Sequence, residues 1–217
     1  MLAQIVLFDG FDPLDVIGPF EVLSAGSDAV GGALEVRLVG IEATGPVTSG
    51  TRGLQLTASG VLRPDVPGFV IVPGASGPVE GDPDEVDTIP VRIARLAETA
   101  LPDLIRAAFA APDTLVATVC GGSLALAMAG LLEGRTAVTH RLGNDLLEAT
   151  GTRVVSARVV DDGDLVTSGG VTSGLDLALH LLERHYGPRI AHAVERLFEY
   201  ERRGTVWRAT GADPIPV

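Results

Sequence analysis

Cysteine, aromatic residues and positive charge are all scarce in this chain of 217 residues. A single cysteine, Cys120, cannot close an intrachain disulfide or build a cysteine-rich zinc site, so it indicates a reducing compartment and leaves a free thiol to explain. Aromatic residues make up 4% of the chain and hydrophobic residues 46%, so the core must consist of Val, Leu, Ile and Ala. This composition excludes a disordered or collagen-like chain.

Basic residues are too few for binding to nucleic acid. The 16 Lys and Arg residues stand against 28 Asp and Glu residues, and the formal net charge of -12 repels a phosphate backbone. The N-terminus lacks a basic leader, and Asp9 and Asp12 precede any cleavage-type site, so the sequence predicts no signal peptide. We therefore expect a cytoplasmic protein without a nucleic-acid partner.

One uncharged run, residues 114–132, is long enough to span a bilayer. Its first part is rich in β-branched residues, its last part repeats apolar residues at helical spacing, and Gly121 and Gly122 stand between them. This pattern predicts a buried strand followed by a buried helix, so we expect no membrane partner.

Short apolar runs alternate with helical patterns along the chain. The runs are apolar throughout, as in central strands of a parallel sheet that helices cover on both faces. They occupy residues 3–8, 34–39, 69–72 and 115–119. Helical patterns occupy residues 20–25, 88–110, 141–149, 173–186 and 190–197.

Three proline positions and one turn signal refine this pattern. Pro19 is expected in the first turn of the first helix, and Pro90 and Pro102 are expected to interrupt the helical segments around them. Asp161 begins an Asp-Asp-Gly-Asp sequence that predicts a hairpin. We therefore predict one α/β domain over residues 1–203. The tail, residues 204–217, gives no clear element, and the acidic stretch of residues 80–87 is expected to be a solvated loop.

Cys120 lies where a strand is expected to end, in the sequence TVCGGS. Two glycines follow, and a helix is expected to begin near Ser123, which is the layout of a nucleophile elbow. Glycines permit a tight turn and the approach of a substrate, and a helix N-terminus stabilises a thiolate and offers N–H groups to a developing anion. We therefore predict a thiolate that persists below neutral pH, with a buried structural cysteine as the alternative.

Two other segments are expected at the same edge of the sheet. VPGASG, residues 72–77, closes a buried strand, and parallel strands share one carboxyl edge, so its N–H groups are candidates for an oxyanion hole. An ordinary turn is the alternative. Asp15 lies in an apolar stretch, where burial would raise its pKa and keep a proton available, with a helix N-cap as the alternative. Asp9, Asp12 and Glu21 are further carboxylates near this edge.

Four strings in the sequence together resemble the ThiJ/PfpI superfamily of glutamine-amidotransferase-like proteins. They are PLDVIGPFEVL, IVPGASG, TVCGGSLALAMAGLLEGRTAVTH and RVVDDGDLVTSGGVTSGLDLALHLLE. The resemblance covers residues 3–202 and is strongest to the isonitrile (isocyanide) hydratase subgroup and to sensor-like domains of AraC-type regulators. It implies a flavodoxin-like three-layer α/β/α sandwich with a mostly parallel central sheet and a nucleophile-elbow cysteine. It also implies a homodimer and no cofactor or metal.

The resemblance assigns roles to individual residues of this chain. It implies that Cys120 is the nucleophile and that Asp15 is the acidic partner next to its thiol. The backbone N–H groups of Gly121 and Ala75, which follows Gly74, match the oxyanion positions. Further residues of a possible pocket are His140, Val171 and Thr172.

This chain departs from the superfamily pattern in three places. Gly121 follows the cysteine, whereas proteases of the superfamily carry His there and the hydratases usually Thr, so a protease triad through this position is excluded. THR at residues 139–141 replaces the usual THW, and the stretch of residues 77–114 is longer than in typical hydratases. Both changes are expected to reshape the pocket.

The histidines predict no metal site, because no third ligand stands at metal-ligand spacing. For His140 a buried structural role is the alternative to a place in the pocket. His180 shares a helical face with Asp176 and Arg184, which indicates exposure to solvent. GGVTSG, residues 169–174, is not a GxGxxG fingerprint, so we expect no bound nucleotide.

Two functions follow from this resemblance. The first is a cysteine-dependent hydro-lyase, in which the Cys120 thiolate attacks an isocyanide or a similar small electrophile and Asp15 exchanges protons with substrate and water. Hydrolysis of the thioimidate then releases an N-formyl amide. The second is a non-catalytic redox or metabolite sensor. A DNA-binding regulator is not expected, because no helix-turn-helix segment follows residue 202.

Overall fold

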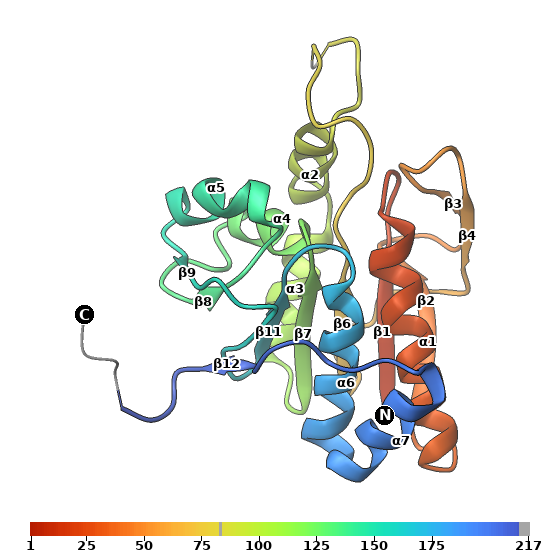
Figure 1. Ribbon diagram of the computed structural model, residues 1–217. Coiled ribbons are helices and arrows are strands. Elements are labelled where there is room, and N and C mark those ends of the chain that lie inside the picture. The colour runs from red at the N-terminus through yellow and green to blue at the C-terminus, as the bar shows by residue number, and fades with distance from the viewer. Residues whose placement is uncertain (83, 213–217) are drawn as a thin grey trace.

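The computed structural model describes residues 1–82 and 84–212. Its central sheet consists of β1 (Leu2–Leu7), β2 (Glu35–Gly40), β5 (Gly60–Val61), β6 (Gly68–Val72), β7 (Thr114–Val119), β10 (Val159–Asp161), β11 (Leu165–Ser168) and β12 (Trp207–Arg208). These eight strands lie in the order β12, β10, β11, β7, β6, β1, β2, β5 (Figure 1). From β11 to β5 all neighbours are parallel, and β10 runs antiparallel to β11. The prediction of a mostly parallel sheet is confirmed.

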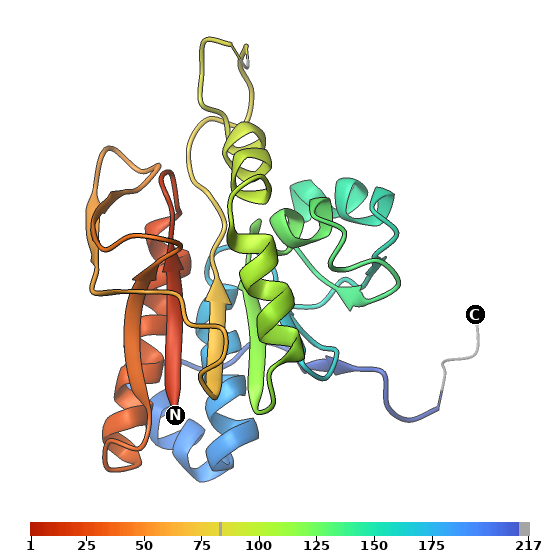
Figure 2. The same ribbon diagram turned by 180° about the vertical axis from the view of Figure 1, so that it is seen from behind.

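Helices cover both faces of this sheet (Figures 1 and 2). On one face α1 (Pro13–Ala29), α6 (Ser173–Tyr186) and α7 (Pro188–Phe198) pack on one another, and on the other face α3 (Leu101–Ala110) lies against β7. The remaining elements are α2 (Ile89–Ala97), α4 (Gly122–Met128), α5 (Asn144–Ala149), the 3-10 turn Arg141–Gly143, and the paired strands β3 (Gly45–Thr48) with β4 (Gln55–Ala58) and β8 (Thr136–Ala137) with β9 (Arg153–Val154). The three-layer α/β/α sandwich is therefore confirmed.

The inner strands carry the aliphatic residues that dominate the composition. Every residue of β1 and β6 is buried, and apolar side chains of the helices pack against them. In β2 the first four residues alternate between exposed and half-buried, because only the two-residue strand β5 lies beyond it. The apolar run of residues 34–39 is thus an outer strand and not a central one.

The first helix begins earlier than the sequence pattern predicts. Asp12 is its N-cap and accepts a hydrogen bond of 2.9 Å from the N–H two residues on, and Pro13 occupies the first turn. Pro19 consequently lies inside the helix, where its ring removes one backbone hydrogen bond, and not in the first turn. Pro90 and Pro102 lie in the first turns of α2 and α3, so they begin these helices instead of interrupting them.

The uncharged run and the acidic stretch have the predicted structures. Residues 114–132 form β7 and α4, and no described helix is long and apolar enough to cross a membrane. The described residues of the acidic stretch 80–87 are exposed. Asp161 ends β10, which pairs with β11 as the predicted hairpin.

The C-terminal segment differs from the expectation, because part of it joins the sheet. Trp207 and Arg208 form β12, which runs parallel to β10, while residues 213–217 lie outside the described part. This segment also buries His180, whose Nε2 lies 2.8 Å from Asp161 Oδ2. The prediction that His180 is exposed is wrong, because a helical face gives no sign that a later segment folds over it.

Candidate active site

Cys120 lies at the carboxyl end of β7, where the chain turns into α4. Its φ is +55°, in the left-handed region that residues with a side chain rarely adopt. Its N–H donates to the carbonyl oxygens of Ser168 and Gly169, both at 3.1 Å. The hydroxyls of Thr139 and Ser123 donate to its carbonyl oxygen at 2.8 and 3.3 Å. These hydrogen bonds hold the strained strand-turn-helix geometry of a nucleophile elbow.

The loop after β6 meets this elbow. A Cβ on Gly74 would lie 2.6 Å from the Gly121 nitrogen, 2.9 Å from Asp15 Oδ2 and 3.1 Å from Cys120 Cβ. The space at Gly74 is therefore filled by two segments that are far apart in the sequence, the first turn of α1 and the elbow at residues 120–121. The loop of residues 72–77 thus packs against the elbow, and its part in an oxyanion hole stays a prediction.

The backbone N–H group of Ala75 does not bond to Phe11, the residue that lies opposite it. Ala75 and Phe11 form an isolated antiparallel bridge. The two hydrogen bonds of this bridge, at 2.9 and 3.1 Å, are made by the residues on either side of the pair. Ala75 and Phe11 themselves therefore form a non-hydrogen-bonded pair. The Ala75 N–H is thus not used by Phe11, as the oxyanion position of the resemblance requires.

Asp15 lies in the first turn of α1 and has no exposed surface. Its Oδ2 accepts a hydrogen bond of 2.9 Å from the Gly74 N–H, and its carboxyl contacts the Cys120 thiol. Its Oδ1 has no hydrogen-bond partner among the residues that the structure describes. Because Asp12 makes the N-cap, the alternative that Asp15 caps the helix is wrong.

Burial dominates the protonation of the Asp15 carboxyl and the Cys120 thiol. It raises the pKa of the Asp15 carboxyl well above its usual range, and the charge of Asp12 raises this pKa further. Burial, followed by the charge of Asp15, raises the pKa of the Cys120 thiol to about 12, although N–H groups of Gly121 and Val171 bond to the sulfur. The prediction of a thiolate below neutral pH is therefore wrong, because desolvation outweighs these amides. The charge of Asp15 therefore disfavours ionisation of Cys120, whereas the hydrogen bond with the Cys120 thiol acts to lower the pKa of Asp15.

The other predicted residues differ in their relation to the thiol. Val171 contacts the sulfur through its backbone N–H. The Thr172 hydroxyl accepts a hydrogen bond of 3.2 Å from Arg158. His140 is half-buried against Gly170, and its Nδ1 accepts a hydrogen bond of 3.3 Å from the N–H two residues on. These contacts favour the structural alternative for His140.

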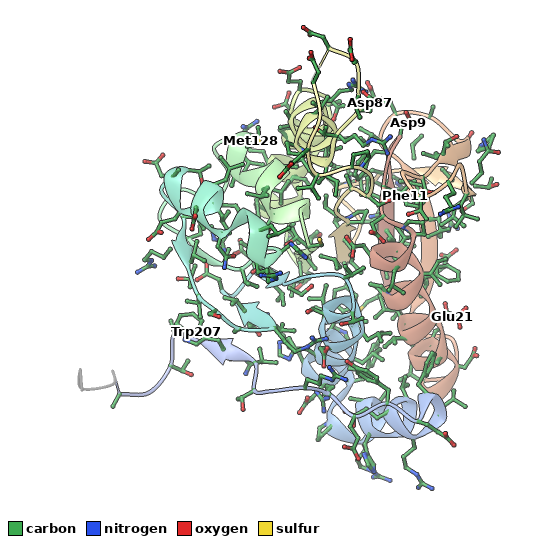
Figure 3. The ribbon with its side chains drawn as sticks, turned by 45° about the horizontal axis from the view of Figure 1, so that its top comes forward. Asp9, Phe11, Glu21, Asp87, Met128 and Trp207 are labelled. Carbon is green, nitrogen blue, oxygen red and sulfur yellow. The ribbon has the colours of Figure 1, made fainter. Side chains whose placement is uncertain are left out.

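Among the other carboxylates that the sequence singles out, Asp12 acts on the buried pair through its charge, whereas Glu21 and Asp9 are exposed. Glu21 is exposed farther along α1, away from Phe11, and Asp9 is exposed in the loop after β1 (Figure 3). No three His, Cys, Asp or Glu side chains within residues 1–82 and 84–212 gather as a metal ion would require.

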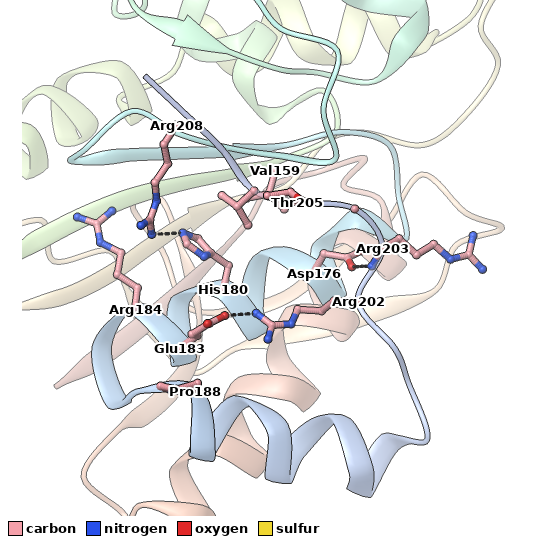
Figure 4. A pocket seen from close by; sticks show the side chains of 12 residues that line it. Val159, Asp176, His180, Glu183, Arg184, Pro188, Arg202, Arg203, Thr205 and Arg208 are labelled. Atoms are coloured by element: carbon pink, nitrogen blue, oxygen red, sulfur yellow. Dashed lines mark hydrogen bonds and ion pairs between the residues drawn. The ribbon is translucent and has the colours of Figure 1, made fainter. Parts of the chain in front are cut away.

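A cavity of about 610 Å³ lies away from the thiol, between α6, β10 and the C-terminal segment (Figure 4). Three of the four arginines that line it are paired with carboxylates, and Arg203, the fourth, bonds to Asp176 only through its backbone N–H. Arg184 and Arg208 contact Asp161 at 2.9 and 3.0 Å, and Arg202 pairs with two glutamates. Because the charges of Arg184, Arg202 and Arg208 each face a carboxylate, these side chains form a structural ion network.

The sequence did not reveal two side chains that contact the elbow from positions distant in the sequence. Thr139 belongs to a motif that the sequence singles out, but nothing local shows that its hydroxyl reaches the Cys120 carbonyl. Ile93 of α2 gave no signal at all, although it packs against Gly121. Both contacts depend on tertiary packing.

Comparisons with known proteins agree with this geometry. The DJ-1/PfpI family model matches residues 1–184. Isonitrile hydratase from Pseudomonas putida is 37% identical over 199 residues, which are 90% of this chain and 76% of that protein. A ThiJ/PfpI family protein from Pseudomonas syringae is 25% identical, with a TM-score of 0.76 over 94% of this chain and 76% of that one. Drosophila melanogaster DJ-1beta shares the fold at 20% identity, with a TM-score of 0.74 over 93% and 98% of the two chains.

Proposed function

Because this chain belongs to the DJ-1/PfpI family, we propose that it is a cysteine-dependent hydratase of an isonitrile or a similar small electrophile. The observation that carries the proposal is the buried Asp15 carboxyl beside Cys120, with one oxygen fixed by Gly74 and the other without a partner. A buried polar atom without a partner costs about 1–3 kcal/mol, which a bound substrate or water would recover. The identity to an isonitrile hydratase supports the substrate class.

The first step joins the isonitrile carbon to sulfur. Asp15, kept neutral by burial, gives its proton to the terminal carbon, and Cys120 Sγ attacks the same carbon while its thiol proton passes to the Asp15 carboxylate. A C–H and a C–S bond form, and the carbon–nitrogen triple bond becomes the double bond of a thioimidate. The step uses two protonated groups, which suits the raised pKa values of both.

Water completes the reaction and restores the thiol. Asp15 protonates the thioimidate nitrogen and then accepts a proton from the water that adds to the carbon. The C–S bond breaks, the hydroxyl proton returns to sulfur, and an N-substituted formamide leaves. The N–H groups of Gly121 and Ala75 would stabilise the charge that develops on the oxygen. One isonitrile and one water are consumed for each formamide.

The test is a turnover assay with the purified protein and para-nitrophenyl isocyanide. We expect formation of the formamide by the wild type and none by the Cys120→Ala variant. Methylglyoxal and peptide substrates serve as controls for other reaction classes. Formamide production that survives in Cys120→Ala, or turnover of the control substrates alone, would refute the proposed reaction.

A redox sensor is the second candidate function. The neutral Asp15 carboxyl is placed to donate a hydrogen bond to an oxidised Cys120 sulfur, which would stabilise that oxidised form. Peroxide treatment followed by mass spectrometry would then show a sulfenic or sulfinic Cys120 in a protein that turns over no isonitrile. Turnover without such oxidation would exclude the sensor.

A further inference from the structure

Helix α2 places Ile93 against the residue that follows the thiol. A Cβ on Gly121 would lie 3.1 Å from Ile93 Cδ1 and 3.5 Å from its Cγ1. Ile93 is 2% exposed, and α2 packs on α4, which begins directly after Gly121. Because the Gly121 N–H bonds to the Cys120 sulfur, Ile93 lies beside the place where an electrophile must meet the thiol.

Backbone conformation does not explain the glycine at position 121. Its φ of -69° and ψ of -5° are right-handed helical values that any residue adopts. The limit is space, because carbon atoms in ordinary contact are about 3.5–4.0 Å apart and Ile93 stands closer than that to the Cβ position. Ile93 thus occupies the volume that a side chain on residue 121 would take.

Arg92 fixes α2 in this position. Its Nη1 donates to the Ser76 carbonyl oxygen at 3.0 Å, and its Nε donates to the Asp87 carbonyl oxygen at 3.1 Å. Its side chain also lies so close to Gly10 that a Cβ there would be 2.7 Å from Arg92 Cδ. The helix is therefore anchored to loops at the carboxyl edge of the sheet, beyond which it rises in Figures 1 and 2.

We propose that Ile93 sets the width of the electrophile that can reach Cys120. Cys120 is 8% exposed, and a branched apolar side chain beside the Gly121 amide leaves a narrow approach. The carbon, the nitrogen and the first substituent atom of an isonitrile lie on one line, so its reacting carbon can enter ahead of its bulk. This inference deepens the proposed function and takes its substrate class from it, but its test needs no turnover.

The test compares alkylation of Cys120 by iodoacetamide, which is slim, and by N-phenylmaleimide, which is broad. Ile93→Ala should raise the N-phenylmaleimide rate by about tenfold or more relative to the iodoacetamide rate, as expected when carbon atoms are removed from a pocket wall. Ile93→Val should shift the ratio in the same direction by less. Because Cys120 is the single cysteine, intact-protein mass spectrometry reports its modification directly.

Leu96→Ala is the matched control. Leu96 is also 2% exposed and lies on α2 one turn from Ile93, so its truncation loosens the helix without opening the wall at Gly121. The ratio of the two rates should stay at the wild-type value. A ratio unchanged in Ile93→Ala, or changed equally in Leu96→Ala, would overturn the proposal whether or not the protein turns over isonitriles.

A second pair of variants tests the complementarity itself. Gly121→Ala alone should slow alkylation by both reagents, because the new methyl group meets Ile93. Adding Ile93→Ala should restore the rates, since the space is then free. If the two substitutions change the alkylation rates independently, so that their fold-changes simply multiply, residues 93 and 121 do not compete for the same volume.

Discussion

Replacing Gly74 with alanine tests the packing of the site with one methyl group. The new Cβ would lie 2.6 Å from the Gly121 nitrogen, 2.9 Å from Asp15 Oδ2 and 3.1 Å from Cys120 Cβ. Gly74 is not among the glycines with a positive φ, so alanine adds no backbone strain there. The whole effect of Gly74→Ala must therefore come from the contacts of the methyl group.

The size of this effect follows from the overlap. Ordinary contact needs about 3.5 Å or more, so the neighbours of Gly74 must move by about 0.5–1 Å. Overpacking of this kind costs about 1–3 kcal/mol of the free energy of unfolding. A displacement of about 1 Å between reacting groups costs about 100-fold in rate. We expect both losses in Gly74→Ala.

Two assays separate these losses, and one control isolates their cause. Urea denaturation measures the free energy of unfolding, and isonitrile turnover with iodoacetamide alkylation measures the alignment of Cys120. Gly60→Ala is the control, because a Cβ at Gly60 meets nothing closer than Val39 Cγ1 at 4.0 Å. A Gly74→Ala protein that keeps the wild-type rates and stability would refute the reasoning.

Three further outcomes are expected. Hydrogen bonds and ion pairs outweigh burial and lower the pKa of Asp161 to about 2, against about 3.9 in an unfolded chain, so Asp161→Asn should lose about 2 kcal/mol of stability at neutral pH. In urea titrations the wild type should lose this stabilisation as the pH falls from about 4 to about 2, and a parallel loss in Asp161→Asn would contradict the assignment. Asp15→Asn should lower the pKa of the Cys120 thiol, because at the high pH where the thiol titrates it removes an ionised carboxylate, and an unchanged pH profile of alkylation would count against this. A homodimer is expected from the mean hydropathy of +0.34. A mass in solution of 22.4 kDa by light scattering, instead of twice that value, would exclude it.

The sheet and the elbow could be predicted because their signals are local. Apolar runs of strand length marked β1, β6 and β7, and the two glycines after Cys120 marked the turn. That Asp15 and Gly74 lie together followed from the rule that parallel strands end at one edge. This rule identifies the shared edge but not the individual atoms that meet there.

The remaining features depend on contacts that no local pattern records. The Cys120 thiol is buried among residues that are far apart in the sequence, such as Asp15 and Val171, so its raised pKa could not be read from a helix N-terminus. His180 is buried by a segment that follows it by more than twenty residues. Ile93 reaches Gly121 through a helix whose place over the elbow is fixed by Arg92.

The most direct test of the account is isonitrile turnover by Asp15→Asn beside Glu21→Gln. Asn keeps the shape of Asp15 and one donor but cannot deliver a proton, whereas Glu21 is an exposed carboxylate on the same helix. We predict that turnover falls by about 100- to 10,000-fold in Asp15→Asn, with little change in melting temperature, and stays at the wild-type rate in Glu21→Gln. Near-normal turnover in Asp15→Asn would remove this carboxyl from the mechanism.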